Sequence, residues 1–572
     1  MRAHGVAWQI GGTAGEGVES GGEAFARALA ASGYVPSTQR DFPSRIRGGD
    51  TTFTVRLTPK GRLAPPRHID LAVAFNATVL PRIDARLGPD SILLLDDDVP
   101  DFISGAGAQV ERLPFGALAK EAGLPKAKNM VALGASAALM GLPLEVLAES
   151  VAGRFARKGE AIVAANKAAL RAGHEAAQAR FGAPRFQAPA PTQGPALWIS
   201  GNEAAALGAL TAGCRVAAAY PITPASDILE YMTPRLQELG GVALQMEDEV
   251  AALNVCIGAG FTGARSLTAT SGPGLSLMTE SIGLAGSAET PCVIVDCQRP
   301  GPSTGMPTKH GQEDLWHMIH GGHGEFVRVV LAPTDVRDAF VATSEAFRLA
   351  EAYRCPAFVA LDQQASLFKQ TIAPFDLQEE ASRHGERDPG SDDDTLNAWD
   401  GSYRPYGGAG EARRVALPGE AGGVYYSNST EHAPTGFTNE QPAVRERMVE
   451  RRLARMEHII ADCVDPIVVE GDGDVAILSW GSTVDACREA RDRLVEDGRD
   501  VRVVGIRLLW PFPKEALEAA VGDRKVVIAE ANAFAQLSRL VRSELPWHDR
   551  ITEVLRYDGT PLLSDDVLEV LP

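Results

Sequence analysis

Residues 216–249 read VAAAYPITPASDILEYMTPRLQELGGVALQMEDE, and this stretch decides the fold. Its apolar beginning, 216–220, predicts a strand, and 227–239 predicts a helix because apolar residues recur there at helical spacing. A second helix is predicted over 249–260, directly after three consecutive acids. Further strands are predicted over 266–270, 292–296 and 357–362. Strands that alternate with helices indicate an α/β fold with a parallel, doubly wound sheet.

The chain of 572 residues is too long for a single hydrophobic core, and its length predicts about three or four domains. We expect a first α/β domain over 1–183, a second over 197–382 and a third over 465–572. Four prolines in the stretch 184–196 predict an extended linker. Most of 383–464 lacks periodicity and predicts a surface arm.

Both outer domains are also predicted to alternate strands with helices. A strand at 6–10 precedes a glycine-rich turn at 11–17 and a helix at 18–33. In the last domain, 501–509 predicts one continuous strand. Between the arm and this domain, 445–460 predicts one strongly charged helix.

Composition excludes several classes of function. The formal net charge of −19 argues against a partner made of duplex nucleic acid. No apolar run reaches the roughly 18 residues that span a bilayer, and the N-terminal residues lack a signal-peptide pattern, so we expect a cytoplasmic protein without a membrane partner. Seven scattered cysteines form no C-x-x-C pair. This excludes a ferredoxin-type cluster and a zinc ribbon on this chain, and we predict no metal ligands here.

The sequence 220–224, Tyr-Pro-Ile-Thr-Pro, is a rigid turn that carries a hydroxyl, and the acids Glu247, Asp248 and Glu249 follow it. Three acids in a row are usually a solvated charge run. Here they open a helix of small residues, and the helix dipole stabilises an acid at that position. Glu249 is the candidate for pointing inward, towards a flat cofactor ring.

Arg299 follows a predicted strand at its carboxyl end, where open α/β sheets bind ligands. A guanidinium there can hold a carboxylate with two hydrogen bonds, although a surface arginine is the alternative. In the first domain, Gly12 and Gly15 in the turn, with Arg45 and Arg47 nearby, suit a phosphate-bearing ligand. The alternatives there are a tight strand–helix turn and a solvated loop.

Gly471-Asp472-Gly473 is similar to the start of the Mg²⁺–diphosphate signature of thiamine enzymes. That signature needs an asparagine further along the chain, and residues 496–505 contain none. We therefore interpret 471–473 as a loop before a strand.

Three blocks together resemble the α subunit of 2-oxoacid:ferredoxin oxidoreductases. They are Tyr-Pro-Ile-Thr-Pro at 220–224, Thr-Ala-Thr-Ser-Gly-Pro-Gly at 268–274 and Gly-Pro-Ser-Thr-Gly-Met-Pro-Thr-Lys at 301–309. The N-terminal segment resembles the separate γ subunit of that family, here fused upstream. The C-terminal segment is similar to the family's transketolase C-terminal-like domain. The resemblance implies a three-domain α/β chain whose middle domain binds the pyrimidine side of thiamine diphosphate.

The resemblance also assigns roles. Glu249 matches the acid that bonds the aminopyrimidine ring and thereby activates the cofactor; Ser271 and Gly272 fall in the cofactor-binding block. Substrate contacts are implied for Thr223, Tyr220, Ile222 and Arg299. Pro300 departs from the glycine often found there and puts the aim of Arg299 in doubt. The γ-like domain is expected to contribute to a coenzyme A site.

The implied activity is oxidative decarboxylation of a 2-oxoacid, most simply 2-oxoglutarate, to an acyl-coenzyme A and CO₂. A β subunit is expected to supply Mg²⁺, the diphosphate motif and a [4Fe–4S] cluster that passes electrons to ferredoxin, in a dimer of αβ heterodimers. Pyruvate or a branched-chain oxoacid stays open as the substrate. The alternatives are half of a transketolase-like carboligase without electron transfer, and a nucleotide-binding or scaffold protein that uses the glycine turn.

Overall fold

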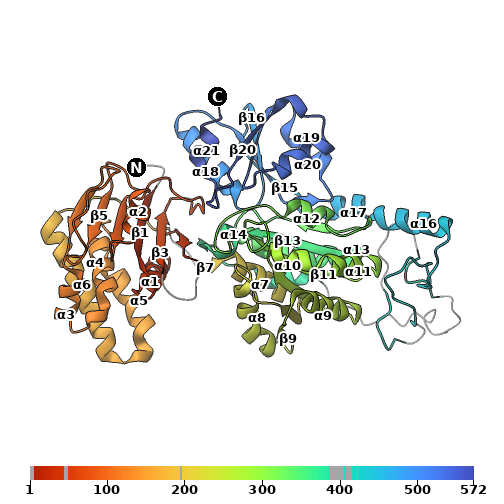
Figure 1. The fold of residues 1–572 in the computed structure, drawn as a ribbon, viewed down its shortest axis with the longest axis horizontal. Coiled ribbons are helices and arrows are strands. Elements are labelled where there is room, and N and C mark those ends of the chain that lie inside the picture. Colours follow the sequence, from red (N-terminus) through yellow and green to blue (C-terminus); the bar gives the residue numbers. More distant parts are fainter. Residues whose placement is uncertain are drawn as a thin grey trace. The chain divides into compact units, whose positions relative to one another are not determined.

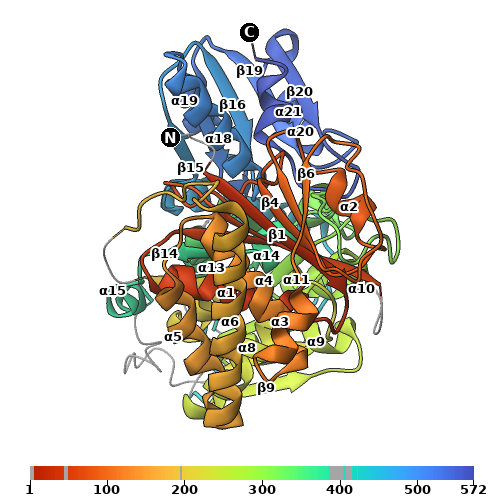
Figure 2. The ribbon, with the colours of Figure 1, turned by 90° about the vertical axis from the view of Figure 1, so that its left-hand side faces the viewer.

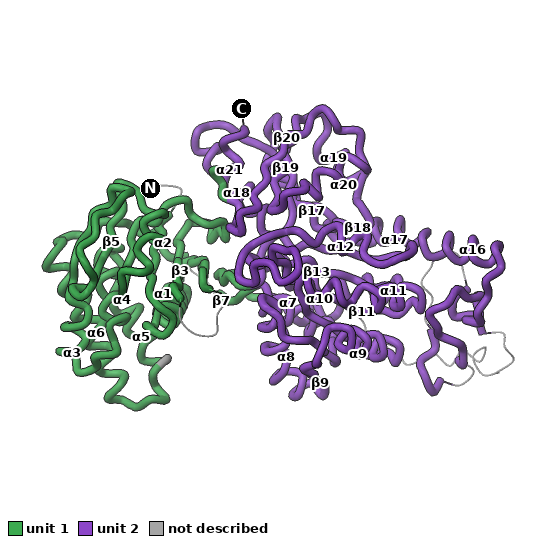
Figure 3. Tube along the Cα trace, in the orientation of Figure 1, with its two compact units in different colours: residues 1–200, 367–374, 563–565 green, residues 201–366, 375–562, 566–572 purple. Residues whose placement is uncertain are grey.

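The computed structural model describes residues 5–43, 49–192, 196–384, 403–407, 415–420 and 423–571. The chain divides into two compact units (Figure 3). Unit 1 comprises Met1–Ser200, Leu367–Pro374 and Leu563–Asp565, and unit 2 comprises Gly201–Ser366, Phe375–Leu562 and Asp566–Pro572. In the described part of the chain, no helix has both the length and the apolar character needed to cross a membrane.

Unit 1 is built on an eight-stranded mixed sheet, in the order β6-β5-β4-β1-β3-β2-β14-β7. Helices α1, α4 and α6 lie on one side of this sheet (Figures 1 and 2). Helices α4 and α6 touch backbone to backbone: a Cβ on Gly134 would lie 1.9 Å from the Leu170 carbonyl oxygen, so only glycine fits. The elements are β1 (Val6–Thr13), α1 (Val18–Ala31), β2 (Pro36–Asp41), β3 (Asp50–Leu57), β4 (Leu71–Ala74), α2 (Leu80–Asp84), β5 (Ile92–Leu95), β6 (Gln109–Arg112), α3 (Phe115–Glu121), α4 (Lys128–Leu139), α5 (Leu144–Phe155), α6 (Glu160–Phe181), β7 (Leu197–Ser200) and β14 (Lys369–Ile372).

The first sheet of unit 2 has seven strands in the order β18-β12-β13-β11-β10-β8-β9. All neighbours are parallel except β18, which pairs antiparallel with β12. The doubly wound sheet predicted from 216–249 is thereby confirmed, with α/β units on consecutive strands. Its elements are α7 (Gly201–Thr211), β8 (Val216–Ala219), α8 (Ser226–Glu238), β9 (Val242–Gln245), α9 (Glu249–Phe261), β10 (Ser266–Thr270), α10 (Gly272–Leu277), α11 (Thr279–Ser287), β11 (Cys292–Gln298), α12 (Leu315–His320), β12 (Val329–Leu331), α13 (Val336–Tyr353), β13 (Pro356–Asp362), α14 (Gln363–Leu367) and α15 (Leu377–Ser382).

The second sheet of unit 2 has five strands in the order β15-β17-β16-β19-β20. Strands β16, β17, β19 and β20 are parallel, and β15 is antiparallel to β17. The elements are β15 (Ile467–Glu470), β16 (Val475–Ser479), α18 (Thr483–Glu496), β17 (Arg502–Ile506), β18 (Leu508–Trp510), α19 (Lys514–Val521), β19 (Lys525–Glu530), α20 (Gln536–Glu544), β20 (Ile551–Leu555) and α21 (Ser564–Leu568).

The single strand predicted over 501–509 is wrong. The chain forms β17 in the five-stranded sheet, and then β18 in the seven-stranded sheet. Arg507, between them, donates to both carboxylate oxygens of Asp338 at 2.9 Å and to the carbonyl oxygens of Val464 and Asp465 at 2.7 Å. This buried guanidinium fixes the point at which the chain changes sheets.

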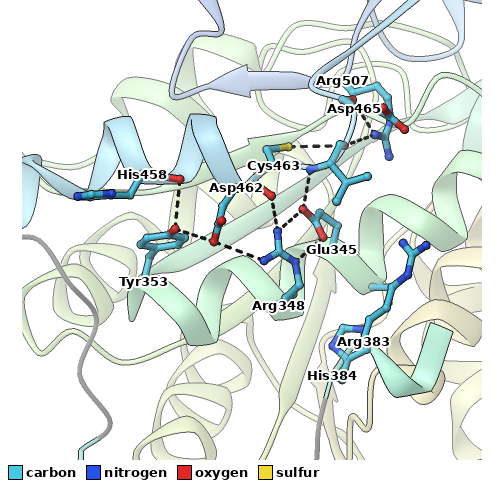
Figure 4. A network of polar contacts seen from close by, with 12 residues as sticks. Glu345, Arg348, Tyr353, Arg383, His384, His458, Asp462, Cys463, Asp465 and Arg507 are labelled. Carbon is cyan, nitrogen blue, oxygen red and sulfur yellow. Dashed lines mark hydrogen bonds and ion pairs between the residues drawn. The ribbon is translucent and has the colours of Figure 1, made fainter. Parts of the chain in front are cut away.

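The single charged helix predicted over 445–460 is two helices, α16 (Pro442–Leu453) and α17 (Arg455–Asp462). Helix α17 is tied to α13 by polar side chains (Figure 4): the Tyr353 hydroxyl donates to Asp462 at 2.8 Å, and Arg348 forms an ion pair with the same carboxylate at 3.6 Å. The carbonyl oxygen of Asp462 also accepts from Arg348 at 2.7 Å. These contacts attach the end of the arm to the seven-stranded sheet.

The predicted turn at 11–17 begins too early. Gly11, Gly12 and Thr13 continue β1 and pair with Thr52, Thr51 and Asp50 of β3. Much of the predicted arm, like Arg45 and Arg47, lies outside the described residues. The domain boundaries predicted from composition stay predictions.

Candidate functional site

Three loops meet at one edge of the seven-stranded sheet. They follow the carboxyl ends of β8, β10 and β11, which are neighbours in the sheet. Such an edge is where open α/β sheets bind ligands. The loops carry residues of the three sequence blocks at 220–224, 268–274 and 301–309.

Thr223 and Arg299 lie together. The Arg299 guanidinium, 7% exposed, donates from Nη1 to the Thr223 carbonyl oxygen at 2.7 Å. The Ile222 carbonyl oxygen accepts from Ala225 at 2.7 Å and so shapes the turn before α8. Tyr220 is 39% exposed at the rim. Hydrogen bonds from Ala225 and Arg299 therefore fix the backbone of this turn.

The three acids at the start of α9 have different environments. Glu247 is exposed, and Asp248 is the N-cap, whose Oδ1 accepts from the Ala251 backbone at 2.7 Å. Capping by a short acid satisfies an otherwise unpaired amide of the first turn. Glu249, the next residue, turns inward and is 6% exposed. The inward position predicted for Glu249 is confirmed.

Gly274, at the start of α10, packs closely against Glu249. A Cβ on Gly274 would lie 2.1 Å from Thr270 Oγ1 and 2.7 Å from Glu249 Oε1. Only glycine therefore lets the start of α10 approach this carboxylate. Ser271, the N-cap of α10, is fully buried, and among the described residues its hydroxyl has no hydrogen-bond partner.

Two further acids complete the edge, and both were missed from the sequence. Asp296 lies in β11, two residues before its carboxyl end, and Asp314 precedes α12. A Cβ on Gly272 would lie 2.8 Å from Asp314 Oδ2. Burial raises the pKa of Asp296 well above its ordinary value and raises that of Asp314 to about 7, while burial lowers the pKa of Arg299. Only the folded sheet brings residue 314 beside 272, so spacing alone gave no signal.

In unit 1, an acid fills the glycine turn. Glu16 Oε2 accepts from the Thr13 backbone at 2.6 Å and from Asn76 Nδ2 at 2.7 Å. A Cβ on Gly12 would lie 2.6 Å from the same oxygen, whereas Gly15 has φ 103° and open space around it. A phosphate bound at this turn would need the Thr13 backbone N–H as a donor, but that group already donates to the Glu16 carboxylate.

The loop predicted at 471–473 is confirmed, since it joins β15 to β16. Asp472 is held by Arg524 at 2.8 Å and also by Arg502. Its carboxylate is thus neutralised by two guanidiniums at the protein surface.

Models of known families match three parts of the chain. Residues 7–176 match "Pyruvate ferredoxin/flavodoxin oxidoreductase", and 207–408 match "Pyruvate flavodoxin/ferredoxin oxidoreductase, thiamine diphosphate-binding". Residues 466–545 match "Transketolase, C-terminal domain". The three-domain α/β organisation with a thiamine diphosphate-binding middle domain is therefore confirmed, and it defines the class of oxoacid oxidoreductases.

Whole-length relatives define the family. The 2-oxoacid:ferredoxin oxidoreductase subunit alpha of Sulfolobus sp is 30% identical, over 99% of this chain and 96% of the relative. The 2-oxoglutarate oxidoreductase subunit KorA of Mycobacterium tuberculosis is 30% identical, over 99% and 91%. A solved 2-oxoglutarate:ferredoxin oxidoreductase from Magnetococcus marinus, with 2-oxoglutarate, coenzyme A and succinyl-CoA bound, is 33% identical with a TM-score of 0.91, covering 99% of this chain and 98% of that one. The chain belongs to the 2-oxoacid:ferredoxin oxidoreductases, as an α subunit with a γ-like domain fused at its N-terminal end.

Proposed function

We propose that this chain supplies the substrate-binding and pyrimidine-binding half of a 2-oxoglutarate:ferredoxin oxidoreductase, which a β subunit completes. The observation that carries the proposal is Glu249, a buried acid at the first turn of α9 beside the glycine start of α10. Gly274 lets the start of α10 come close to the Glu249 carboxylate, and the buried Ser271 hydroxyl lacks a partner among the described residues. These features fit thiamine diphosphate, which supplies the electron sink for decarboxylation when it is bound.

Each residue of the edge has a task in this reaction. Glu249 would hold the aminopyrimidine ring of the cofactor through a hydrogen bond and would carry the proton at that bond. Arg299 binds the carboxylate of the oxoacid, since a guanidinium matches a carboxylate with two donors. Thr223, with Tyr220 and Ile222 beside it, orients the oxo group, and Ser271 and Gly272 border the cofactor.

The reaction breaks the bond between the carboxyl carbon and the oxo carbon and releases CO₂. The two electrons released by this oxidation would go to ferredoxin, and an iron–sulfur cluster of the β subunit would supply the one-electron chemistry that this requires. The acyl group joins the coenzyme A sulfur, and the thiol proton goes to solvent. Coenzyme A and 2-oxoglutarate are proposed because a solved relative of 33% identity has both bound.

The β subunit is proposed to carry the cluster, Mg²⁺ and the diphosphate site. All seven cysteines of this chain are buried, and they are spread from Cys214 to Cys487. Asp472, in the only Gly-Asp-Gly sequence, is paired with arginines. Native mass spectrometry of the co-expressed subunits tests the proposed dimer of αβ heterodimers; a lone chain with full activity contradicts it.

The substrate is tested with the complex reconstituted from this chain, its β subunit, thiamine diphosphate and Mg²⁺. We expect coenzyme A-dependent reduction of ferredoxin that is faster with 2-oxoglutarate than with pyruvate or a branched-chain oxoacid. Equal or greater kcat/KM with pyruvate overturns the substrate assignment. A complex that turns over none of these oxoacids, with its cluster and cofactor loaded, overturns the proposed function.

A further inference from the structure

Asn202, in the first turn of α7, bonds the end of the turn at 220–224. Its side-chain Nδ2 donates to the Pro224 carbonyl oxygen at 2.7 Å, and the residue is fully buried. The carbonyl oxygen of the preceding residue, Thr223, accepts from Arg299. Two consecutive carbonyl groups of this turn are therefore held by two side chains from different parts of the chain.

Both ends of the Asn202 amide have a partner. The thiol of Cys297, which is fully buried in β11, donates to Asn202 Oδ1 at 3.3 Å. Because the Pro224 carbonyl oxygen can only accept, it requires the amide nitrogen on its side. The reversed amide would place Oδ1 against that carbonyl oxygen and leave two buried acceptors in contact. The thiol and the carbonyl group together select the orientation in which Asn202 donates to the turn.

The attachment points of Asn202 lie in closely packed parts of unit 2. A Cβ on Gly201 would lie 2.1 Å from the Ala365 carbonyl oxygen, so the start of α7 lies against α14 and only glycine fits there. Cys297 belongs to β11, the central strand of the seven-stranded sheet, and pairs there with Leu361 of β13. Asn202 thus connects the turn to a helix start and a strand whose positions are fixed by close packing.

Asn202 differs from the rest of the buried part of α7. The other buried residues of this helix, all of which is described, are Gly201, Ala204, Ala205, Ala206, Gly208, Ala209 and Leu210. Burial of an amide costs free energy unless the amide is hydrogen-bonded, and alanine would suit both the packing and the helix. The bond to the turn is therefore the feature that explains an asparagine at this position.

We propose that Asn202, oriented by Cys297, is a positioning residue for the oxoacid site. Through the Pro224 carbonyl group it fixes the turn, and thereby the place of Thr223 relative to Arg299, so that both residues meet one substrate molecule. This inference rests on the proposed function, because it takes Thr223 and Arg299 as substrate-binding residues. It adds that a fully buried side chain sets the geometry of the pair.

The experiment measures kcat and KM for 2-oxoglutarate with the reconstituted αβ complex, at saturating coenzyme A and per loaded cofactor site. Asn202→Ala removes the donor to Pro224. Because a displacement of about 1 Å in a positioning group can cost about 100-fold in rate, we expect kcat/KM to fall about 10- to 100-fold. The loss should lie mainly in kcat, since Arg299 still binds the carboxylate. An unchanged kcat/KM overturns the inference.

A double-mutant cycle tests whether Asn202 acts through Thr223. Thr223→Val keeps the branched shape and removes the hydroxyl that is proposed to orient the oxo group. In this background, adding Asn202→Ala should lower kcat/KM by less than about threefold, because residues that act through one another are not additive. The same fold-loss in both backgrounds overturns the inference alone. A Thr223→Val variant with unchanged kcat/KM overturns both the proposed role of Thr223 and this inference.

Asn166→Ala is the matched control. Asn166 is also buried, and its Nδ2 donates to the Ile162 carbonyl oxygen at 2.8 Å within α6. This bond has no connection with the turn, so kcat/KM should stay within about twofold. A loss as large as that of Asn202→Ala would show that the effect belongs to any buried asparagine, and it overturns the inference.

Cys297 provides a second pair of variants for the case in which Asn202→Ala folds poorly. Cys297→Ala removes the donor to Asn202 Oδ1 and should lower kcat/KM about 2- to 10-fold, as expected for one hydrogen bond. Cys297→Ser keeps a donor and should restore most of this loss. Equal losses in the two folded variants overturn the positioning by Asn202 and Cys297. A loaded complex without oxoacid turnover overturns the proposed function, and the inference falls with it.

Discussion

Two buried charged clusters in unit 2 differ in how they treat their acids. At the sheet edge, the carboxylate of Asp296 makes no hydrogen bond among the described residues. Behind α11, Glu289 is enclosed by guanidiniums: Arg455 lies at 2.6 Å, Arg354 at 3.8 Å, and Arg451 also contacts it. An acid enclosed in this way serves stability, whereas an unpaired buried acid such as Asp296 is a candidate for a functional role.

The largest effect is expected from Glu249→Gln. It removes the acid proposed to hold the cofactor proton, so kcat should fall by about 100- to 10,000-fold, the usual contribution of acid–base catalysis. The measurement is ferredoxin reduction by the reconstituted complex, with circular dichroism to establish folding.

Asp248→Asn is the matched control for Glu249→Gln, because asparagine caps a helix as well as aspartate does. It changes the neighbouring acid, whose side chain bonds Ala251, and should leave kcat within about twofold. Similar losses in the two variants would indicate damage to α9 rather than chemistry at Glu249.

In the enclosed cluster, Glu289→Gln should act on stability. Removing one partner of a buried ion pair leaves unpaired charge and costs about 3–5 kcal/mol. Because α16 and α17 supply Arg451 and Arg455, amide hydrogen exchange in these helices should accelerate before that of β11. The exposed Glu280 on α11 provides the control, Glu280→Gln. If both variants exchange alike, the cluster does not anchor these helices.

At the sheet edge, Arg299→Lys tests whether this arginine binds the substrate carboxylate. Lysine keeps the charge but loses the planar pair of donors, and a charged hydrogen bond contributes about 1.5–3 kcal/mol. We therefore expect kcat/KM for 2-oxoglutarate to fall about 10- to 100-fold, mainly through KM. An unchanged KM would mean that another residue binds the carboxylate.

The two clusters also explain what the sequence could reveal. Local patterns predicted the alternation of strands and helices and the inward position of Glu249, because both depend on neighbours within one helical turn. The switch of sheets at Arg507 depends on Asp338, and the place of Asp314 depends on Gly272. Those contacts join distant parts of the chain, so residue spacing carries no trace of them.

The glycine turn of unit 1 was uncertain for a related reason. Glycines before a helix suit a phosphate or a plain turn equally well, and the choice depends on which group meets the amides. Here the Glu16 carboxylate accepts from the Thr13 amide, and the side chain of Asn76, 60 residues away in the sequence, donates to that carboxylate. No spacing rule links those two residues.

The smallest effect is expected from Asp472→Asn, which tests the one sequence that is similar to a Mg²⁺–diphosphate signature. The Asp472 side chain is 77% exposed, and its pairs with Arg502 and Arg524 lie at the surface. Surface ion pairs contribute about 0–1 kcal/mol, so the Mg²⁺ concentration for half-maximal activity should stay within about twofold. A much larger rise would place the metal on this chain and remove a main reason for assigning it to the β subunit.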